Sequence, residues 1–227
     1  TAKPADPIIV HPDVRRMLMT QRALTEGCRM LALWTAQALD VSERHPDPAV
    51  AKQADDMVAL MTPVVKAFLT DSGVEVANIG VQVLGGHGFI RANGQEQYAR
   101  DVRITPIYEG TNGIQSMDLL GRKVLHLDLF GSFGAPVEAY VERHEGDERM
   151  AEFVEPLAAS YDLLEDATRV IRERTGARPE EAGAAAVDYM RLFALTAVGY
   201  LFARAAEVSL PKSNADFHRA KLATARF

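Results

Sequence analysis

The chain has 227 residues, of which 48% are hydrophobic and 25% charged, the balance of a globular protein rather than a disordered one. Its formal net charge of -6 offers no basic surface to a nucleic acid, and we expect no apolar run to span a bilayer. A single cysteine, Cys28, excludes an intramolecular disulfide, and the first residues lack the pattern of a signal peptide. These features together predict a cytoplasmic protein.

The first 84 residues predict three amphipathic helices, because apolar residues recur at three- and four-residue steps. The first helix is expected over 12–43 and the second over 48–69. A turn is expected at residues 71–73, where Asp, Ser and Gly follow one another, and a third helix over 72–84. Gly80 inside this third helix indicates that another backbone approaches it closely.

A long polar stretch interrupts the helical pattern between Gly85 and Gly110. It carries glycine clusters at both ends and at most one short helical turn, near Gln95 to Val102. Long loops in compact domains are usually functional or disordered, and the apolar side chains of this one argue against disorder. We therefore expect a helical frame that holds this loop against a ligand.

A fourth helix is expected after the loop and through about Leu127. Thr111 or Asn112 could cap its first turn, and Asn112 followed by Gln115 has the spacing of a capping box. The side chains that we expect to face inward are Ile114, Met117, Leu120 and Val124.

The second half of the chain also reads as helix, after an expected linker at residues 131–136. Apolar periodicity predicts two long helices, over 147–174 and 179–208. A short final helix follows, which Ser213 or Asn214 could cap.

These elements predict an all-α fold, with a four-helix bundle over 1–128 and a helical hairpin extension over 136–227. The chain begins with Thr rather than Met, and its last residues stop within a helical pattern that has no cap. We therefore expect a fragment of a longer polypeptide.

Glu109 is the acidic residue whose surroundings suggest chemistry. It lies between an apolar pair, Ile107 and Tyr108, and the expected helix start at residues 110–112. Apolar neighbours remove water from a carboxylate and make it a stronger base, so this side chain could act as a general base. The alternative is a carboxylate that only complements the dipole of the following helix.

The glycine clusters could let the backbone approach a ligand closely. Gly85 and Gly86 lack the spacing of a dinucleotide fingerprint and could instead form a helix C-cap, while Gln82 could offer its amide to a ligand. Residues 110–113 expose backbone N–H groups at a helix start, which suits an anion or a carbonyl oxygen but also an ordinary N-cap. The residues alone leave both choices open.

The charged residues of the loop have a structural explanation. Arg100, Asp101 and Arg103 are expected to form an ion-pair knot that fixes the loop, with a phosphate contact by Arg103 as the alternative. His87 has no second histidine or carboxylate at metal-ligand spacing, so no metal site is predicted.

Three segments resemble the C-terminal domain of acyl-CoA dehydrogenases. They are 82–89 (QVLGGHGF), 100–104 (RDVRI) and 107–115 (IYEGTNGIQ), in this order and at plausible separation. Several motifs in order are more specific than any one of them. The opening residues 11–18 and the helices after about residue 130 resemble the bacterial branch that includes the 3-methylmercaptopropionyl-CoA dehydrogenases.

The resemblance implies an enzyme that binds FAD and oxidises the α–β bond of an acyl-CoA thioester. Glu109 falls on the family's catalytic base, and the backbone at Glu109 and Gly110 would bind the thioester oxygen. The implied partners are the acyl-CoA substrate, an electron-transfer flavoprotein and further copies of the chain in a homodimer or homotetramer.

The resemblance also implies which residues contact the flavin. A segment of the same subunit would contribute Thr111, Asn112 and Gly113, and a neighbouring subunit would contribute Gln82, Gly85 and Gly86.

The sequence departs from the family in what precedes the bundle. The family has an N-terminal helical domain and a β-domain that help to cover the flavin, and neither is present here. The resemblance therefore implies that this chain alone binds FAD poorly and turns over slowly or not at all. Two alternatives stay open, namely a non-catalytic helical module for oligomer contacts and an acyl-CoA oxidase that passes electrons to oxygen on the same scaffold.

Overall fold

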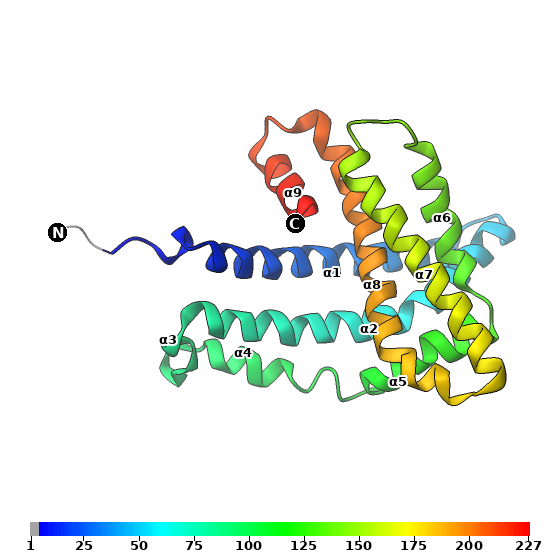
Figure 1. Ribbon diagram of the computed structural model, residues 1–227, viewed down its shortest axis with the longest axis horizontal. Coiled ribbons are helices and arrows are strands. Elements are labelled where there is room, and N and C mark those ends of the chain that lie inside the picture. The colour runs from blue at the N-terminus through cyan, green and yellow to red at the C-terminus, as the bar shows by residue number, and fades with distance from the viewer. Residues whose placement is uncertain (1–4) are drawn as a thin grey trace.

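The computed structural model describes residues 5–227, which form helices joined by loops and contain no strand (Figure 1). The predicted all-α fold is therefore confirmed. A short 3-10 turn, η1 (Ile8–Val10), leads into α1 (Pro12–Arg44), which matches the helix predicted over 12–43. Pro12 starts α1 because a proline at the first helical position loses no hydrogen bond there.

Helix α2 (Pro48–Leu84) is continuous and runs antiparallel to α1 (Figure 1). The turn predicted at residues 71–73 is wrong, because these small residues pack inside the helix. Ser72 is buried, and a Cβ added at Gly73 would lie 3.1 Å from the Val102 side chain. Small residues here allow neighbouring segments to approach α2 instead of reversing the chain.

Three short elements follow α2 and lead back along it: α3 (Gly86–Phe89), η2 (Arg91–Asn93) and α4 (Gln95–Val102). Helix α4 lies where a short helical turn was predicted, but the prediction of a long loop with at most one such turn is wrong, because packing on α2 supports further helical turns. The Gln95 amide donates to the Ala77 carbonyl at 3.3 Å, and a Cβ on Gly80 would overlap that amide. Gly80 therefore does allow a close approach, but to a side chain rather than to a backbone.

The next helix begins as α5 (Asn112–Met117) and continues as a π-helix, η3 (Asp118–His126). Thr111 caps α5, since its Oγ1 accepts from the Ile114 N–H at 3.4 Å. The capping box predicted for Asn112 is wrong because Asn112 lies inside the helix and its side chain bonds to α2. Leu120 and Val124 are buried as predicted.

Two of the side chains predicted to face inward are exposed instead. Ile114 is 63% exposed and Met117 is 39% exposed. The prediction assumed one α-helical period, whereas the change to i→i+5 hydrogen bonding after Met117 alters which face of the helix is buried.

The second half of the chain consists of α6 (Phe130–Arg143), α7 (Ala151–Ala177), α8 (Glu180–Ser209), η4 (Leu210–Lys212) and α9 (Asp216–Arg226). The linker predicted at 131–136 is wrong, since these residues start α6: Phe133 is fully buried, and the Tyr161 hydroxyl fills the space beside Gly134. Ala215 occupies the N-cap of α9 and no side chain caps it, so the predicted Ser213 or Asn214 cap is also wrong.

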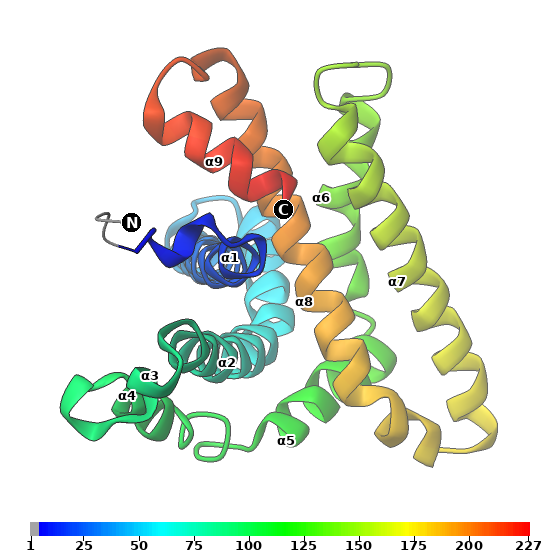
Figure 2. The same cartoon turned by 60° about the vertical axis from the view of Figure 1, so that its left-hand side comes forward.

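Helix α8 lies between α7 and the α1–α2 pair and joins the two halves of the chain (Figure 2). One buried cluster extends through both halves and is centred on aromatic side chains, with the Phe133 and Phe193 rings 4.7 Å apart. The boundaries predicted at 128 and 136 stay a prediction, because the core itself is continuous across them.

Among residues 5–227, two helices are long and apolar enough to cross a membrane, contrary to the expectation from sequence: α2 and the segment Glu180–Lys212. Of their most apolar windows, 44% and 61% of the residues are buried inside the fold. Much of the apolar surface of these helices packs against other helices. Length and apolar composition alone therefore do not distinguish a buried core helix from a helix that spans a membrane.

Candidate active site

The predicted site residues fall into two segments that the fold holds apart. Asn112, at the start of α5, contacts Thr70 in the middle of α2. Gln82 lies near the end of the same helix, about 18 Å further along at 1.5 Å per residue. Figure 1 shows α3 at one end of this half of α2 and α5 towards the other, with α4 between them. Within one chain the two segments do not converge on one point.

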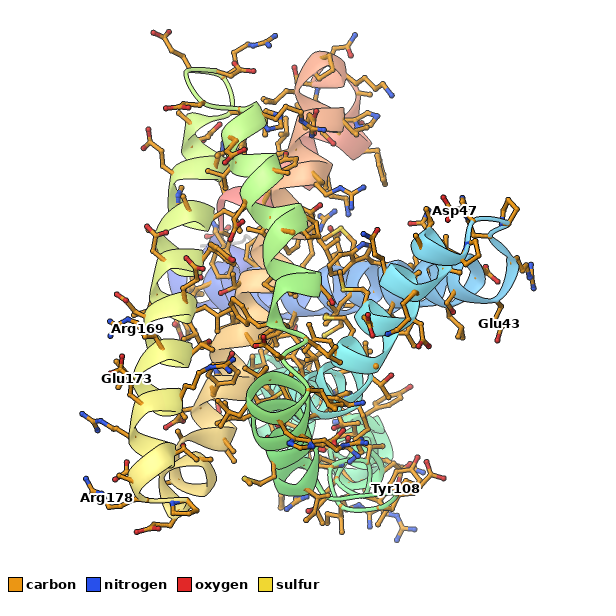
Figure 3. All side chains as sticks on the ribbon, turned by 90° about the vertical axis from the view of Figure 1, so that its right-hand side faces the viewer. Glu43, Asp47, Tyr108, Arg169, Glu173 and Arg178 are labelled. Atoms are coloured by element: carbon orange, nitrogen blue, oxygen red, sulfur yellow. The ribbon has the colours of Figure 1, made fainter. Side chains whose placement is uncertain are left out.

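Glu109 lies in the loop before α5 and has a left-handed backbone, with φ of 53°. Glu109 is exposed, and the side chains of Ile107 and Tyr108 are about half exposed. Figure 3 shows Tyr108 at the edge of the molecule, far from the labelled residues of α7. This chain therefore does not bury the carboxylate, although the apolar neighbours that the sequence suggested are beside it.

The left-handed conformation of Glu109 costs about 1–3 kcal/mol for a residue with a side chain, and it persists only where the surroundings enforce it. Such strain clusters at functional sites in proteins. The following residue, Gly110, is also left-handed, with φ of 85°, and glycine adopts this conformation without strain.

Backbone hydrogen bonds close the loop around Glu109. The Tyr108 N–H donates to the Ile104 carbonyl at 3.3 Å, and the Asn112 N–H donates to the Pro106 carbonyl at 3.0 Å. The second bond brings residues 106 and 112 together, so Glu109 lies at the tip of a closed turn. The Gln115 amide reaches the Glu109 carbonyl at 3.5 Å from the first turns of α5.

The side chain of Asn112 attaches this turn to α2. Its Nδ2 carries two hydrogens and lies within hydrogen-bond distance of three acceptors, namely the Asp71 carboxylate at 2.7 Å, Thr70 Oγ1 at 2.9 Å and the Ala67 carbonyl at 3.1 Å. Its Oδ1 accepts from Lys66 Nζ at 2.7 Å. Sequence reasoning missed Lys66 and Thr70; their only signal was two polar residues four positions apart on a largely apolar helix.

The second segment forms an ordinary helix end. Gly85 is left-handed, with φ of 58°, and its N–H donates to the Gln82 carbonyl at 3.1 Å. The C-cap interpretation therefore holds for Gly85. Gln82, Gly85 and Gly86 are nevertheless exposed, and no atom lies within 4 Å of a Cβ added at either glycine. The backbone here is open to contact by another molecule.

The ion-pair knot predicted for Arg100, Asp101 and Arg103 is wrong. Arg100 pairs with Glu96 at 2.6 Å, one turn earlier in α4, and Asp101 accepts from the Gln97 amide at 3.3 Å. The helix explains this, because residues four positions apart share a face whereas residues 100 and 101 point in different directions. Within residues 5–227, Arg103 makes no ion pair and is exposed.

Large apolar side chains are exposed on the same elements, which we call the loop face. They are Leu84, Phe89, Ile90, Tyr98, Ile104, Ile107, Tyr108 and Ile114. A concentration of exposed apolar side chains is uncommon on a monomer surface and marks a surface that binds something. The loop face is therefore a candidate surface for contact with another molecule or domain.

Comparison with known families matches both halves of the chain. The profile described as "Acyl-CoA dehydrogenase, C-terminal domain" matches residues 2–125, and the profile described as "Acetyl-CoA dehydrogenase C-terminal like" matches residues 133–227.

The curated relatives are longer than this chain. A 3-methylmercaptopropionyl-CoA dehydrogenase of Ruegeria pomeroyi is 43% identical over 99% of this chain and 39% of its own length. A butyryl-CoA dehydrogenase of Syntrophomonas wolfei is 30% identical over 99% of the chain and 38% of its own length. The chain thus spans about two fifths of these relatives.

A solved structure shows the same fold. Caenorhabditis elegans ACDH-11, crystallised in complex with C11-CoA, superposes with a TM-score of 0.70 over 95% of this chain and 35% of that one. The sequence identity is 21%, so this likeness concerns the fold alone.

Proposed function

We propose, since this chain belongs to the acyl-CoA dehydrogenase family, that it carries the general base of an FAD-dependent enzyme that desaturates acyl-CoA thioesters. The observation that carries the proposal is Glu109. It is an exposed carboxylate held in a strained backbone conformation at the tip of a closed turn. A solvated carboxylate with no structural task gains nothing from such strain, whereas a base benefits from being held in one place.

In this proposal Glu109 removes the α-proton of the thioester. The backbone N–H of Glu109 donates to the thioester oxygen and stabilises the negative charge that develops there, and the left-handed Gly110 lets the chain turn away beside it. The exposed loop face excludes water once it is covered, which strengthens both interactions.

The residues present fit FAD. The open backbone at Gly85 and Gly86 can lie against a large planar group, and Thr111 and Gly113 expose polar atoms beside Glu109. When bound, FAD would supply the acceptor for the hydride that leaves the β-carbon. Thr111, Asn112 and Gly113 would contact the flavin of the same subunit, while Gln82, Gly85 and Gly86 would contact that of a neighbour.

The distance between the two segments supports a site shared between subunits. Asn112 contacts α2 at Thr70, about 18 Å along the helix from Gln82, so the two segments are poorly placed to meet the same ring, but they can belong to two sites in a homodimer or homotetramer. We further propose an electron-transfer flavoprotein as the electron acceptor. The greater length of the relatives supports a longer parent protein whose other domains cover the loop face.

The test is Glu109→Gln in the full-length protein. The change removes the base but keeps the size of the side chain, so kcat should fall at least about 100-fold while flavin absorbance is retained. Glu173→Gln, at an exposed position of α7, is the matched control and should leave kcat unchanged. Activity of the Glu109→Gln protein within twofold of wild type would remove Glu109 from this role.

The same preparations separate the two alternatives. A full-length wild-type protein without flavin would indicate the non-catalytic helical module. Hydrogen peroxide formed in equal amount to the unsaturated product would indicate an oxidase.

A further inference from the structure

We propose that Asn112 is a positioning residue, whose side chain is attached to α2 and fixes where Glu109 lies, rather than a side-chain ligand of the cofactor. Lys66 is the cation that orients it. The inference rests on the proposed function for its kinetic meaning, but the attachment itself can be measured without activity.

The backbone of Asn112 defines one end of the turn that carries Glu109. Its N–H closes the turn by donating to the Pro106 carbonyl at 3.0 Å. Only Gly110 and Thr111 separate Glu109 from Asn112. Any displacement of Asn112 is therefore transmitted to Glu109 through a very short piece of chain.

The side chain of Asn112 is fully engaged by α2. Its Nδ2 has two hydrogens and three acceptors within reach, on Ala67, Thr70 and Asp71, at 2.7 to 3.1 Å. Its Oδ1 accepts from Lys66 Nζ at 2.7 Å. Thr70 Oγ1 lies 3.2 Å from the same Oδ1 and can fill its second lone pair, so the amide has no polar group left to offer a cofactor except its backbone.

Lys66 and Asp71 fix the orientation of this amide. The carbonyl end faces the ammonium group of Lys66, and the NH2 end faces the carboxylate of Asp71, so a flipped amide would place like partial charges in contact. Lys66 makes no ion pair within residues 5–227 and donates only to Asn112. The ammonium group of Lys66 is half-buried and has the neutral Asn112 amide as its acceptor. This arrangement indicates that Lys66 orients the amide.

The attachment explains how Glu109 keeps a strained conformation. A left-handed glutamate relaxes unless both ends of its turn are held. The Pro106 end is held by backbone bonds, and the Asn112 end by a side chain that reaches back more than 40 residues. Asn112 thus acts on catalysis through the position of Glu109.

The kinetic test uses Asn112→Asp in the full-length holoenzyme. This change keeps the acceptor for Lys66 but places a second carboxylate against Asp71. We expect kcat to fall at least about tenfold, with KM and flavin content within twofold of wild type, and the isotope effect with α-deuterated substrate to rise. In the Asp71→Asn/Asn112→Asp double variant the donor and acceptor are exchanged. This variant should recover at least half of the decrease in log kcat that the single variant shows.

The second readout is amide hydrogen exchange in this chain. Exchange at residues 108–112 should accelerate at least about tenfold in Asn112→Asp and in Lys66→Met. Lys52→Met is the matched control, because Lys52 lies on the same helix and pairs only with Asp56 at the surface. It should leave the exchange of the loop unchanged.

Three results would overturn the inference. One is loss of flavin from Asn112→Asp with unchanged exchange of the loop, which would make Asn112 a direct cofactor contact. Another is unchanged kcat together with unchanged exchange. The third is a double variant no better than the single one. A full-length wild-type protein that lacked flavin or dehydrogenase activity would refute the proposed function, and the exchange data would still decide whether the attachment exists.

Discussion

The two segments predicted to contact flavin are both exposed, yet they obtain their shape in different ways. Residues 82–89 are shaped locally, by the end of α2 and by backbone contacts between α2 and α3. Residues 106–113 are shaped at a distance, because Asn112 bonds to side chains of α2 that precede it by more than 40 positions. Only the second segment contains a strained residue with a side chain.

This difference indicates which of the two segments must be held in one exact conformation. A segment that offers an open backbone to a partner can rely on a glycine C-cap, which forms wherever the helix ends. A segment that must hold one carboxylate against conformational strain needs contacts from outside itself. Changes at each segment should separate these two modes of support.

The largest expected effect is at Gly88, which tests local support. A Cβ here would lie 2.5 Å from the Val81 carbonyl oxygen and 2.9 Å from the Val81 Cα, so the backbone of one segment must move. We expect Gly88→Ala to lower the free energy of unfolding by about 3 kcal/mol in urea titration. Exchange at residues 108–112 should stay as in wild type, and its acceleration would show that the two segments are not independent.

A smaller effect of opposite sign is expected at Glu109. Glu109→Gly removes the left-handed strain at the expense of backbone entropy, for a net stabilisation of about 1 kcal/mol. Asp128 is the matched control, since it is also left-handed, with φ of 55°, but pairs with Arg172 at 2.8 Å. Asp128→Gly should give no net gain. A loss of stability in Glu109→Gly would show that the carboxylate, rather than the cofactor site, explains the conformation.

The smallest effect on stability is expected at Gly86. A Cβ here meets nothing within 4 Å, so Gly86→Ala should change the free energy of unfolding of this chain by less than about 0.5 kcal/mol. Under the proposed function, the added methyl lies where the flavin of a neighbouring subunit approaches, so the full-length protein should retain less flavin. Unchanged flavin content would remove Gly86 from the cofactor site.

The same division decides what could be predicted from the sequence. The helix at 12–43 follows from local periodicity and is confirmed, whereas the helical turns of α3, η2 and α4 lie in a stretch that was predicted to be mostly loop. The turn at 71–73 and the linker at 131–136 were wrong because glycine, serine and aspartate there serve contacts with distant side chains, such as Tyr161 beside Gly134. Sequence rules treat such residues as helix breakers. The side chains that contact them come from distant parts of the chain and can be identified only in the folded structure.

The candidate site shows this limit most clearly. Glu109 and the glycines belong to short motifs, so the sequence could single them out. Lys66 and Thr70 belong to no motif and acquire their role only because α5 starts against the middle of α2. The exposed Ile114 and the buried Leu120 fall on different faces because the helix changes to a π-helix between them, and apolar periodicity does not reveal that change.

The length of α2 between Thr70 and Gln82 has a genetic consequence under the proposed function. An allele damaged at Gln82 and an allele damaged at Glu109 would carry their lesions in different halves of a shared centre. A heterodimer of the two products would concentrate both lesions in one centre and leave the other whole. Two recessive alleles of this gene could therefore show intragenic complementation.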